Sequence, residues 1–390
     1  MRVIWSLVIA ASIWLPNIHN IFEVDLAQYR QHNAIAPKAQ QIAEYHLNIW
    51  RSTKLRTQEL AMMQRRNPEW NFMSRMYFIL ALTNMALHDP SFKSEAISII
   101  DFIIEDTLSL EVSKGHTHFL LAYAQRGSWA IPPNRSHFID GELAVMLGAR
   151  RFLKEDQRYK RLLQERVELM VKRMKKSPIL NAESYPRECW LFCNTVSLAA
   201  MKMMDHLDGS DHTPLFQEWL KHAQNDLFHH ESQLLISTYD TNGTPLAAGQ
   251  CPEGSTIFMS AHMLQIIDPH FAQSQYQKAK EGMIQSFLGF GYAKEWTTSC
   301  VGHADIDSGP IIPFLNASAS SSGLAVLGAA TFNDNKNLKS LLTSLEMIGF
   351  PELTDGRIRY LTSNPVGDAV LLYSLVEGPL WRLIQGKNSE

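Results

Sequence analysis

The chain has 390 residues, of which 45% are hydrophobic and 10% aromatic, and its formal net charge is −3 at pH 7. This length suits two domains or one large helical toroid, and the composition is ample for a large core. The charge balance shows no bias towards a polyanion, and the basic run RMKK at 173–176 fits the solvated face of a helix. We therefore expect no nucleic-acid partner.

The N-terminus predicts a signal-like or anchoring segment over residues 1–20. Arg2 is followed by an apolar run from Val3 to Leu15. This run has the length of the apolar region of a signal peptide and is short for a bilayer span. We expect export to the periplasm or anchoring to a membrane through this segment, and the alternative is a buried N-terminal helix. No later stretch is expected to span a bilayer.

From residue 36 onward the sequence alternates between two kinds of helix. The amphipathic segments are 37–64, 93–106, 158–176, 213–228, 271–286 and 336–348. The segments that are apolar or small on every side are 70–87, 139–155, 190–207, 254–268, 319–332 and 367–384. A helix that is apolar all round is buried, and an amphipathic helix covers it. The alternation predicts an all-α fold, an (α/α)6 barrel, as a single domain over 37–385.

The connections between these helices predict which end of the barrel is functional. Links from an amphipathic helix to the next apolar one are long, at 107–138 (with a short helix near 117–125), 177–189, 229–253, 287–318 and 349–366. Only the link at 65–69 is short. Long connections inside a compact domain are usually functional. Because each one leads into an inner helix, we expect all of them, and the site, at one end of the barrel.

Acidic residues gather in these connections and at the helix starts that follow. They are Asp140, Glu142, Glu183, Glu188, Glu253, Glu295, Asp305, Asp307 and Asp368. Helix capping explains any one of them, but the whole set exceeds what capping requires. Paired carboxylates in a partly apolar cavity split their pKa values, so that one serves as acid and the other as base. We predict catalytic roles for Asp305, Asp307, Glu253 and Glu188, and substrate-binding roles for Asp140 and Glu142.

The segment GHADIDSGP at 302–310 carries the most specific of these predictions. Asp305 and Asp307 lie on the same side of an extended chain, and the Ser-Gly-Pro turn that follows would hold them. We predict that one of them points into the central cavity and titrates as a coupled pair with a carboxylate from another helix start. His303 is a candidate binding residue, whereas His262 is predicted to be a hydrogen-bonded core residue.

Aromatic and sulfur-containing side chains accompany the acids. Tyr185, Trp190, Tyr292 and Trp296 are predicted to bind substrate, by stacking a sugar or lining an isoprenoid pocket. The cysteines at 189, 193, 251 and 300 are too few for a disulfide scaffold and are expected to be small buried thiols, with 189 and 193 one helical turn apart. The alternative is a zinc site made by Cys189, Cys193, Cys251 and His303, but its spacing matches no standard motif, and we expect no metal.

The order DGELAVMLGARRFL, SYPRECWLFCNTVSLAA, CPEGSTIFMSAHMLQ, GFGYAKEW and DIDSGP resembles the bacterial (α/α)6-barrel group of linalool dehydratase/isomerase, roughly over 135–385. The resemblance implies a cofactor-free, exported enzyme that acts on allylic terpene alcohols through cysteines with nearby acidic, tyrosine and histidine residues. Cys193, which is followed by Asn194, matches one family cysteine and is therefore a predicted catalytic residue. The second family cysteine belongs farther upstream, where this chain has Glu183 and Ser184.

Three functions remain as alternatives. The first is a cofactor-independent lyase or isomerase that dehydrates or isomerises a small alcohol by acid–base chemistry, with a thiol assisting. The second is a glycoside hydrolase or polysaccharide lyase that uses paired carboxylates on the same barrel. The third is a barrel that binds without catalysis. We expect a small-molecule substrate and no cofactor, and a homo-oligomer is compatible with each alternative.

Overall fold

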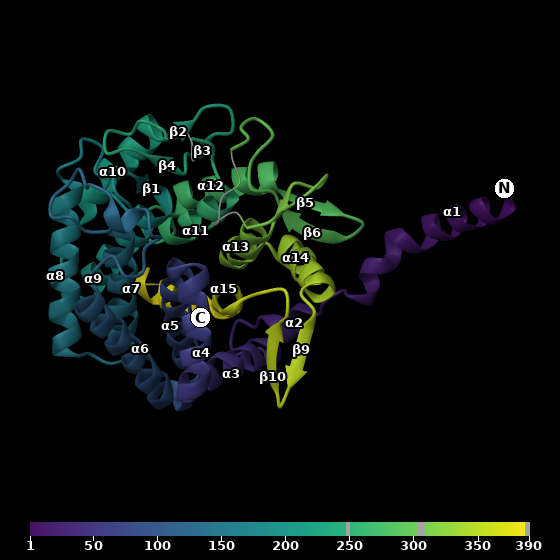
Figure 1. Cartoon of the computed structure of the whole chain (residues 1–390), viewed down its shortest axis with the longest axis horizontal. Helices are drawn as coiled ribbons and strands as arrows, with labels where there is room; N and C mark the ends of the chain where they lie inside the picture. Colours follow the sequence, from purple (N-terminus) through teal and green to yellow (C-terminus); the bar gives the residue numbers. More distant parts are fainter. Residues whose placement is uncertain (247–249, 303, 305–308, 387–390) are drawn as a thin grey trace.

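Six helices that are apolar on nearly every side form a closed inner ring in the computed structural model, which describes residues 1–246, 250–302, 304 and 309–386. They are α5 (Pro68–His88), α7 (His137–Leu153), α9 (Leu191–Asp208), α11 (Gly254–Leu264), α13 (Ala319–Thr331) and α15 (Pro365–Val376). Each helix contacts the next in this order, and α15 contacts α5, which closes the ring (Figure 1). Their side chains are almost all buried because no side of these segments is polar.

A second layer of helices surrounds the ring (Figure 1). It consists of α3 (Pro37–Arg51), α6 (Lys93–Lys114), α8 (Gln157–Met174), α10 (Thr213–Asp226), α12 (Pro269–Met283) and α14 (Asn335–Ile348). Their buried residues recur at helical spacing, as Tyr159, Leu163, Val167 and Met170 do in α8. The two layers form the (α/α)6 barrel that the sequence predicts.

Several helix boundaries differ from the prediction: α6 continues to Lys114 instead of ending at 106, and two predicted helices are divided. Segment 37–64 is divided into α3 and α4 (Thr53–Arg66), because the Ser52 hydroxyl accepts the Leu55 N–H and starts a second helix. Segment 367–384 is divided into α15 and α16 (Pro379–Ile384), and Gly378 between them has φ of 125°. Near 117–125 the chain forms turns and the short 3-10 helix η3 (Ala124–Arg126).

The end of the ring where the inner helices finish is covered by α16, which contacts α5 and α9. Trp381 Nε1 donates to Tyr373 Oη at 2.6 Å, and His262 Nε2 lies 2.6 Å from the same hydroxyl. His262 also contacts Thr331 Oγ1 at 2.6 Å, and burial lowers its pKa to about 3. The prediction that His262 is a hydrogen-bonded core residue is confirmed.

The opposite end carries the long connections, as predicted, and the described parts of them contain five two-stranded antiparallel sheets. The strand pairs are β1 (Cys189–Trp190) with β4 (Thr238–Tyr239), β2 (Phe228–His229) with β3 (Leu234–Leu235), β5 (Ile284–Phe287) with β6 (Phe290–Ala293), β7 (Ile311–Ile312) with β8 (Ala317–Ser318), and β9 (Pro351–Thr354) with β10 (Arg357–Tyr360). Cys189 therefore lies in a strand, and the expectation that it shares a helix turn with Cys193 is wrong.

The N-terminal segment forms α1 (Arg2–Trp14) and the 3-10 helix η1 (Leu15–Ile21), which extend away from the barrel (Figure 1). Its apolar side chains are exposed, with Trp5 at 64% and Trp14 at 70%. Within the described part of the chain, Arg2–Tyr29 is the one helical stretch long and apolar enough to cross a membrane. The alternative of a buried N-terminal helix is therefore wrong.

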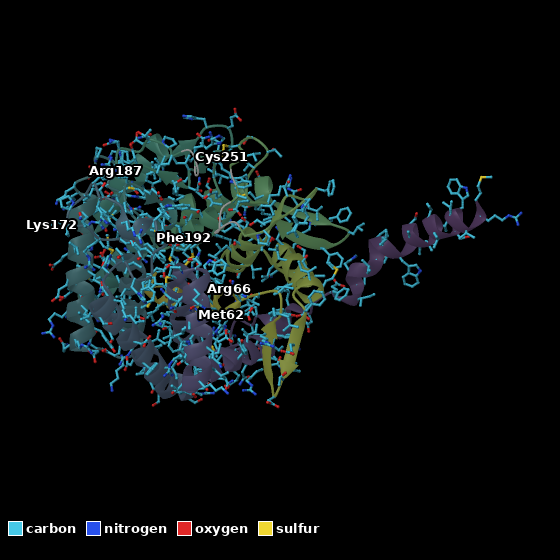
Figure 2. The ribbon with its side chains drawn as sticks, in the orientation of Figure 1. Met62, Arg66, Lys172, Arg187, Phe192 and Cys251 are labelled. Carbon is cyan, nitrogen blue, oxygen red and sulfur yellow. A yellow bond between two sulfur atoms is a disulfide. The ribbon has the colours of Figure 1, made fainter. Side chains whose placement is uncertain are left out.

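The basic run at 173–176 is not wholly solvated. Lys175 and Lys176 are exposed, and Lys172 just before them lies at the outer edge of the molecule (Figure 2). Arg173, however, is fully buried, and its guanidinium lies 6.0 Å from the centre of the Trp129 ring. The expectation of a solvated face is wrong for this residue, because α8 turns it towards the barrel interior.

Candidate functional site

A disulfide between Cys251 and Cys300, with 5.5 Å between the Cα atoms, joins two of the long connections. One connection precedes α11 and the other precedes α13, the neighbouring inner helix. The expectation of buried thiols is wrong for these two cysteines, because both segments meet at the open end of the barrel. It is correct for Cys189 and Cys193. A zinc site cannot include Cys251 while this disulfide is intact.

Replacing both Cys251 and Cys300 by serine should lower the free energy of unfolding by about 2–4 kcal/mol, because the crosslink restricts the unfolded chain. Denaturant unfolding of the wild-type and double-variant proteins checks this, and a reductant should destabilise the wild type while leaving the variant unchanged. Equal unfolding midpoints for the two oxidised proteins would contradict the expectation.

Glu253 and Trp296, two predicted site residues, lie together at the start of α11. Their backbones pair in an isolated antiparallel bridge, and the buried Glu253 N–H donates to Ser237 Oγ at 2.9 Å. Trp296 Nε1 is buried without a hydrogen-bond partner among the described residues. The disulfide lies two residues before Glu253 along the chain, so it fixes the backbone that carries this acid.

The carboxylate of Glu295 joins two inner helices. It accepts hydrogen bonds from the Ser318 and Ser321 hydroxyls at 2.5 and 2.6 Å at the start of α13. It also accepts the Ser255 hydroxyl and the Ser255 N–H at the start of α11. These contacts give Glu295 a structural role at the open end of the barrel.

Asp140, a predicted binding residue, is fully buried in an ion-pair cluster between α7 and the outer helices. Its carboxylate accepts from Arg135 Nη2 and Arg166 Nη1, both at 2.6 Å. Glu111 of α6 binds the same two arginines and accepts from His116 Nδ1 at 2.9 Å. Burial raises the pKa of Asp140, but the Arg135 hydrogen bond and the nearby positive charges outweigh it and keep the pKa low. The cluster faces the outer layer.

Glu111, His116 and Asp140 are also close enough together to hold a metal ion. Both carboxylates, however, already bind the two arginines, and the guanidinium groups balance their charge. His116 Nε2 accepts the Ser136 N–H, which leaves Nδ1 as the donor to Glu111. The donor set fits an ion-pair network better than a cation site.

Glu142 lies two residues after Asp140 and therefore points in nearly the opposite direction, about 200° round the helix, towards the barrel axis. It is fully buried, and neither carboxyl oxygen has a hydrogen-bond partner among the described residues. Burial, and then the negative charge of Glu69, raise its pKa well above the usual value. Burial therefore favours the protonated, neutral form of the Glu142 carboxyl over the ionised form.

Two residues of α5 that were not predicted as site residues, Glu69 and Tyr77, are coupled to Glu142 through charge. Glu69, in the first turn of α5, accepts the Leu121 N–H at 3.1 Å, and its charge reaches Glu142. The hydroxyl of Tyr77 is buried without a described partner, and burial and the charge of Glu142 raise its pKa. Glu69 lies at the start of an inner helix, as the predicted acids do. It was not predicted because the link before this helix, 65–69, is short, and the prediction considered acids that follow long links.

An aromatic cluster lies at the open end of α7, and we refer to Phe138, Tyr185, Trp190 and Tyr123 as the rim cluster. Phe138 lies one turn before Glu142 on the same face of α7 and stacks on Tyr185 at 6.3 Å between ring centres. Tyr185 in turn contacts Trp190 at 6.2 Å and Tyr123 at 6.1 Å. The predicted aromatic residues Tyr185 and Trp190 are thus linked, through Phe138, to the face of α7 that carries Glu142.

Glu188 lies on the rim cluster. Its Oε2 accepts from Tyr123 Oη at 3.2 Å and from Trp190 Nε1 at 3.5 Å. Burial raises its pKa, although these two hydrogen bonds oppose the shift. Glu188 is thus a second acid in apolar surroundings on the same side of the ring as Glu142.

Cys193 lies in the first turn of α9, on the face that packs against α7. Ser197 is one turn further along this face, and its hydroxyl fills the space that a side chain on Gly141 would need. The close approach of the two helices explains glycine at 141. Cys193 is buried and Phe192 beside it lies near the middle of the ring in Figure 2. The structure therefore brings Cys193 to the helix that carries Glu142.

Tyr292, another predicted site residue, lies away from Glu142. Tyr292 is in β6, which packs on α13 and α14, and α13 is opposite α7 in the ring. His303, Asp305 and Asp307 lie outside the described residues, so their predicted roles remain predictions.

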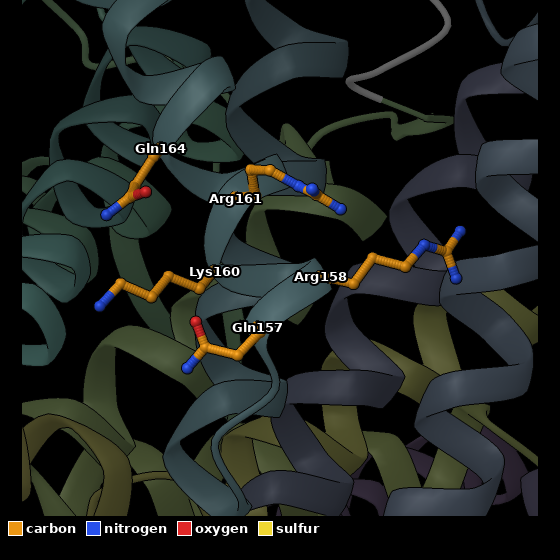
Figure 3. A pocket seen from close by; sticks show the side chains of 5 residues that line it. All are labelled: Gln157, Arg158, Lys160, Arg161 and Gln164. Atoms are coloured by element: carbon orange, nitrogen blue, oxygen red, sulfur yellow. The ribbon is translucent and has the colours of Figure 1, made fainter.

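The outer surface of α8 carries an exposed hollow of about 280 Å³ lined by Gln157, Arg158, Lys160, Arg161 and Gln164. Figure 3 shows these side chains diverging along the helix. Arg158 forms an ion pair with Glu105 there, and the hollow lies on the outer layer of helices. It therefore takes no part in the site at the open end.

The closed double ring, with acids and aromatic residues where the inner helices begin, defines a protein of the (α/α)6-barrel class. This chain belongs to the linalool dehydratase/isomerase family, whose sequence model matches residues 140–365. The match includes Glu142, Cys193 and Glu253. The resemblance noted in the sequence is confirmed at the level of the family.

Solved structures of sugar-active proteins share the fold. An Asp-to-Asn variant of UGL with the saccharide dGlcA-Glc-Rha-Glc has 13% identity and a TM-score of 0.50, over 80% of this chain and 86% of that one. The unsaturated glucuronyl hydrolase from Bacillus sp. GL1 has 11% identity and a TM-score of 0.49, over 80% of this chain and 86% of that one. The unsaturated glucuronyl hydrolase from Streptococcus agalactiae has 11% identity and a TM-score of 0.49, over 77% of this chain and 80% of that one. At these identities the likeness concerns the fold alone.

Proposed function

We propose that this protein is a cofactor-independent lyase or isomerase that dehydrates or isomerises a small allylic alcohol. The observation that carries the proposal is Glu142, a buried acid without a described hydrogen-bond partner, one helical turn from the rim cluster. Membership of the linalool dehydratase/isomerase family supports the reaction class. We infer that the substrate binds between Glu142 and the rim cluster.

In this mechanism Glu142 donates its proton to the alcohol oxygen. The C–O bond then breaks, water leaves with the bonding electron pair, and an allylic cation remains. The faces of the Phe138, Tyr185 and Trp190 rings carry partial negative charge and stabilise that cation. Loss of a proton from the neighbouring carbon gives the diene, whereas return of water to the other end of the allyl group gives the isomeric alcohol. A protonated acid is required at the first step, which a raised pKa supplies.

The proton must leave to a base within reach of the cation. Glu69 is the candidate among the described residues, because its charge already acts on Glu142. Glu253, Asp305 and Asp307 keep their predicted roles as further acid–base groups, and Glu188 is a candidate acid on the rim cluster. Asp140 has a different role in this proposal, because Arg135 and Arg166 hold its carboxylate on the outer side of α7.

A direct assay separates this function from the alternatives. The full chain is incubated with linalool and with primary allylic alcohols of similar size, and gas chromatography follows diene and isomer formation. The proposal expects turnover without added metal or cofactor. Turnover only of an unsaturated glucuronyl disaccharide would replace the proposal with the glycosidase alternative, and binding of either compound without product would support a non-catalytic barrel.

Cys193→Ala tests the part played by the thiol. If Cys193 assists catalysis, the variant should lose turnover of the alcohol with little change in thermal unfolding. Retained turnover, with about 1–2 kcal/mol lost from the free energy of unfolding, would mark Cys193 as a core residue. Cys189→Ala is the matched control, because that thiol is equally buried but lies in β1.

We also propose that residues 1–20 take the chain out of the cytoplasm and hold it at a membrane. The exposed apolar helix α1 supports this location. The Cys251–Cys300 disulfide also supports it, because disulfides persist in oxidising compartments.

A further inference from the structure

The hairpin formed by β5 and β6 has an apolar, uncharged tip. Residues 284–293 read IQSFLGFGYA and contain no charged side chain. At the tip, Phe287 pairs with Phe290, and Phe287 is 56% exposed. The Phe287 side chain thus adds exposed apolar surface at the end of a hairpin that has no charged residue.

The turn itself is unfavourable for a residue such as leucine. Leu288 and Gly289 have φ of 49° and 84°, which makes a two-residue turn with both central residues in the left-handed region. Asparagine, aspartate or glycine normally occupies the first of these positions, and leucine there is strained. The strained position holds a second apolar side chain, which is partly buried and follows the exposed Phe287 in the chain.

The β9–β10 hairpin provides a comparison within the same chain. Its turn, Asp355-Gly356, has φ of 51° and 75°, so the geometry is the same with the residue that the turn favours. Its strands carry Glu352, Arg357 and Arg359. Turn geometry therefore does not explain the apolar tip of β5–β6.

The N-terminal segment indicates what covers this tip. At the end of η1, His19 contacts Phe290 edge-on at 6.3 Å between ring centres, and Phe22 contacts the same ring at 6.3 Å. Gly289 leaves room for the His19 ring, and Glu23 pairs with Lys339 of α14 at 2.5 Å. The apolar segment is thus fixed to the hairpin at its base, and both lie on the same side of the barrel (Figure 1).

The length of α1 and η1 determines how deep the hairpin tip would lie in a bilayer that the N-terminal segment crosses. At ~1.5 Å per α-helical residue and ~2.0 Å per 3-10 residue, the 13 residues of α1 and the 7 of η1 together extend over about 34 Å. The apolar core of a bilayer is about 30 Å thick. If α1 and η1 lie along the membrane normal, His19 and the hairpin tip lie where the apolar core meets the head groups.

We propose that the β5–β6 tip, through Phe287 and Leu288, inserts into the lipid surface beside the N-terminal anchor. The inference rests on the anchoring role proposed above and adds a second point of attachment, which fixes the orientation of the barrel relative to the bilayer. The occupant is lipid because the tip lies beside η1 and continues the exposed apolar surface of α1 and η1, and the first acidic residue of the chain, Glu23, comes after both helices.

The test uses an environment-sensitive label on the full chain. Cys189 and Cys193 are buried and Cys251 and Cys300 are paired, so Phe287→Cys provides the one readily labelled thiol for a nitrobenzoxadiazole dye. Leu353→Cys, at a position 61% exposed on β9, is the matched control. On vesicles of phosphatidylcholine and phosphatidylglycerol, the label at 287 should shift to shorter wavelength and be quenched by nitroxide-bearing lipid, whereas the label at 353 should not.

Vesicle flotation separates this proposal from the anchor on which it rests. A chain that does not float with vesicles overturns both. If the chain floats but the label at 287 stays exposed to water, the hairpin proposal alone is overturned. The hairpin proposal is also overturned if the label becomes shielded without lipid as the protein concentration rises, because the tip then contacts a second copy of the chain. Leu288→Asn restores a favoured turn residue, so it should fold normally and weaken quenching of the 287 label.

Discussion

Glu142→Gln should lower kcat for the alcohol by about 10²–10⁴-fold, the contribution typical of a positioned general acid. The glutamine keeps the shape and polarity of the protonated acid but has no proton to donate. Steady-state kinetics on the wild type and the variant measure the effect. Asp368→Asn is the matched control: burial raises the pKa of Asp368 to about 7, but its hydrogen bonds are with Ser363 and Tyr360, beside β10. This control should keep wild-type turnover.

The same substitution should make the protein more stable at neutral pH. The pKa of Glu142 is raised in the folded protein, so between the unfolded pKa near 4.5 and the higher folded pKa the unfolded chain releases a proton that the folded chain keeps. The stability of the wild type therefore falls as pH rises through this window, by about 1.4 kcal/mol per pH unit. Glutamine does not titrate and escapes this loss.

Denaturant unfolding at pH 4 and pH 7 checks that expectation. The two proteins should have similar midpoints at pH 4, where the acid is protonated in both states, and the variant should have the higher midpoint at pH 7. Lower stability of the variant at both pH values, with unchanged kcat, would show that Glu142 is an ionised structural residue and would remove it from the proposed mechanism.

Asp140→Asn should lower the free energy of unfolding by about 3–5 kcal/mol, because it removes the fully buried carboxylate and leaves the partly buried Arg135 and Arg166 with one carboxylate, Glu111, between them. This is a large fraction of the 5–15 kcal/mol typical of a folded domain. The pKa of Asp140 is lowered, so its contribution is present above the unfolded pKa near 3.8 and is lost as pH falls below it. The difference between wild type and variant should therefore shrink at pH 3.

Glu105→Gln provides the control for that experiment. It removes an ion pair with Arg158 in which the two side chains are 41% and 55% exposed, and such pairs contribute about 0–1 kcal/mol. The kinetic expectation for Asp140→Asn is separate from stability. At a temperature where the Asp140→Asn variant is folded, the KM of this variant should equal the KM of the wild type. A raised KM with unchanged stability would instead restore Asp140 as the substrate-binding residue that the sequence predicts.

The barrel can be predicted from the pattern of apolar residues in the sequence. Segments such as 190–207 and 319–332 have no polar side, so they can be stable only when other helices surround them, and the amphipathic segments between them supply that cover. The order of short and long links likewise placed the functional end where the inner helices begin. The local pattern decides these features because helical burial depends on residues three and four apart.

The surroundings of each side chain at that end of the barrel become known only from the tertiary structure. Asp140 and Glu142 are equivalent acids in the sequence, and their two-residue spacing says only that they point apart. One side of α7 faces the outer layer, where Arg135 and Arg166 lower the pKa of Asp140, and the other side faces the barrel axis, where burial raises the pKa of Glu142. Cys251 and Cys300 pair, and Glu69 reaches Glu142, across long stretches of chain. Such contacts depend on how distant segments pack, which no local pattern encodes.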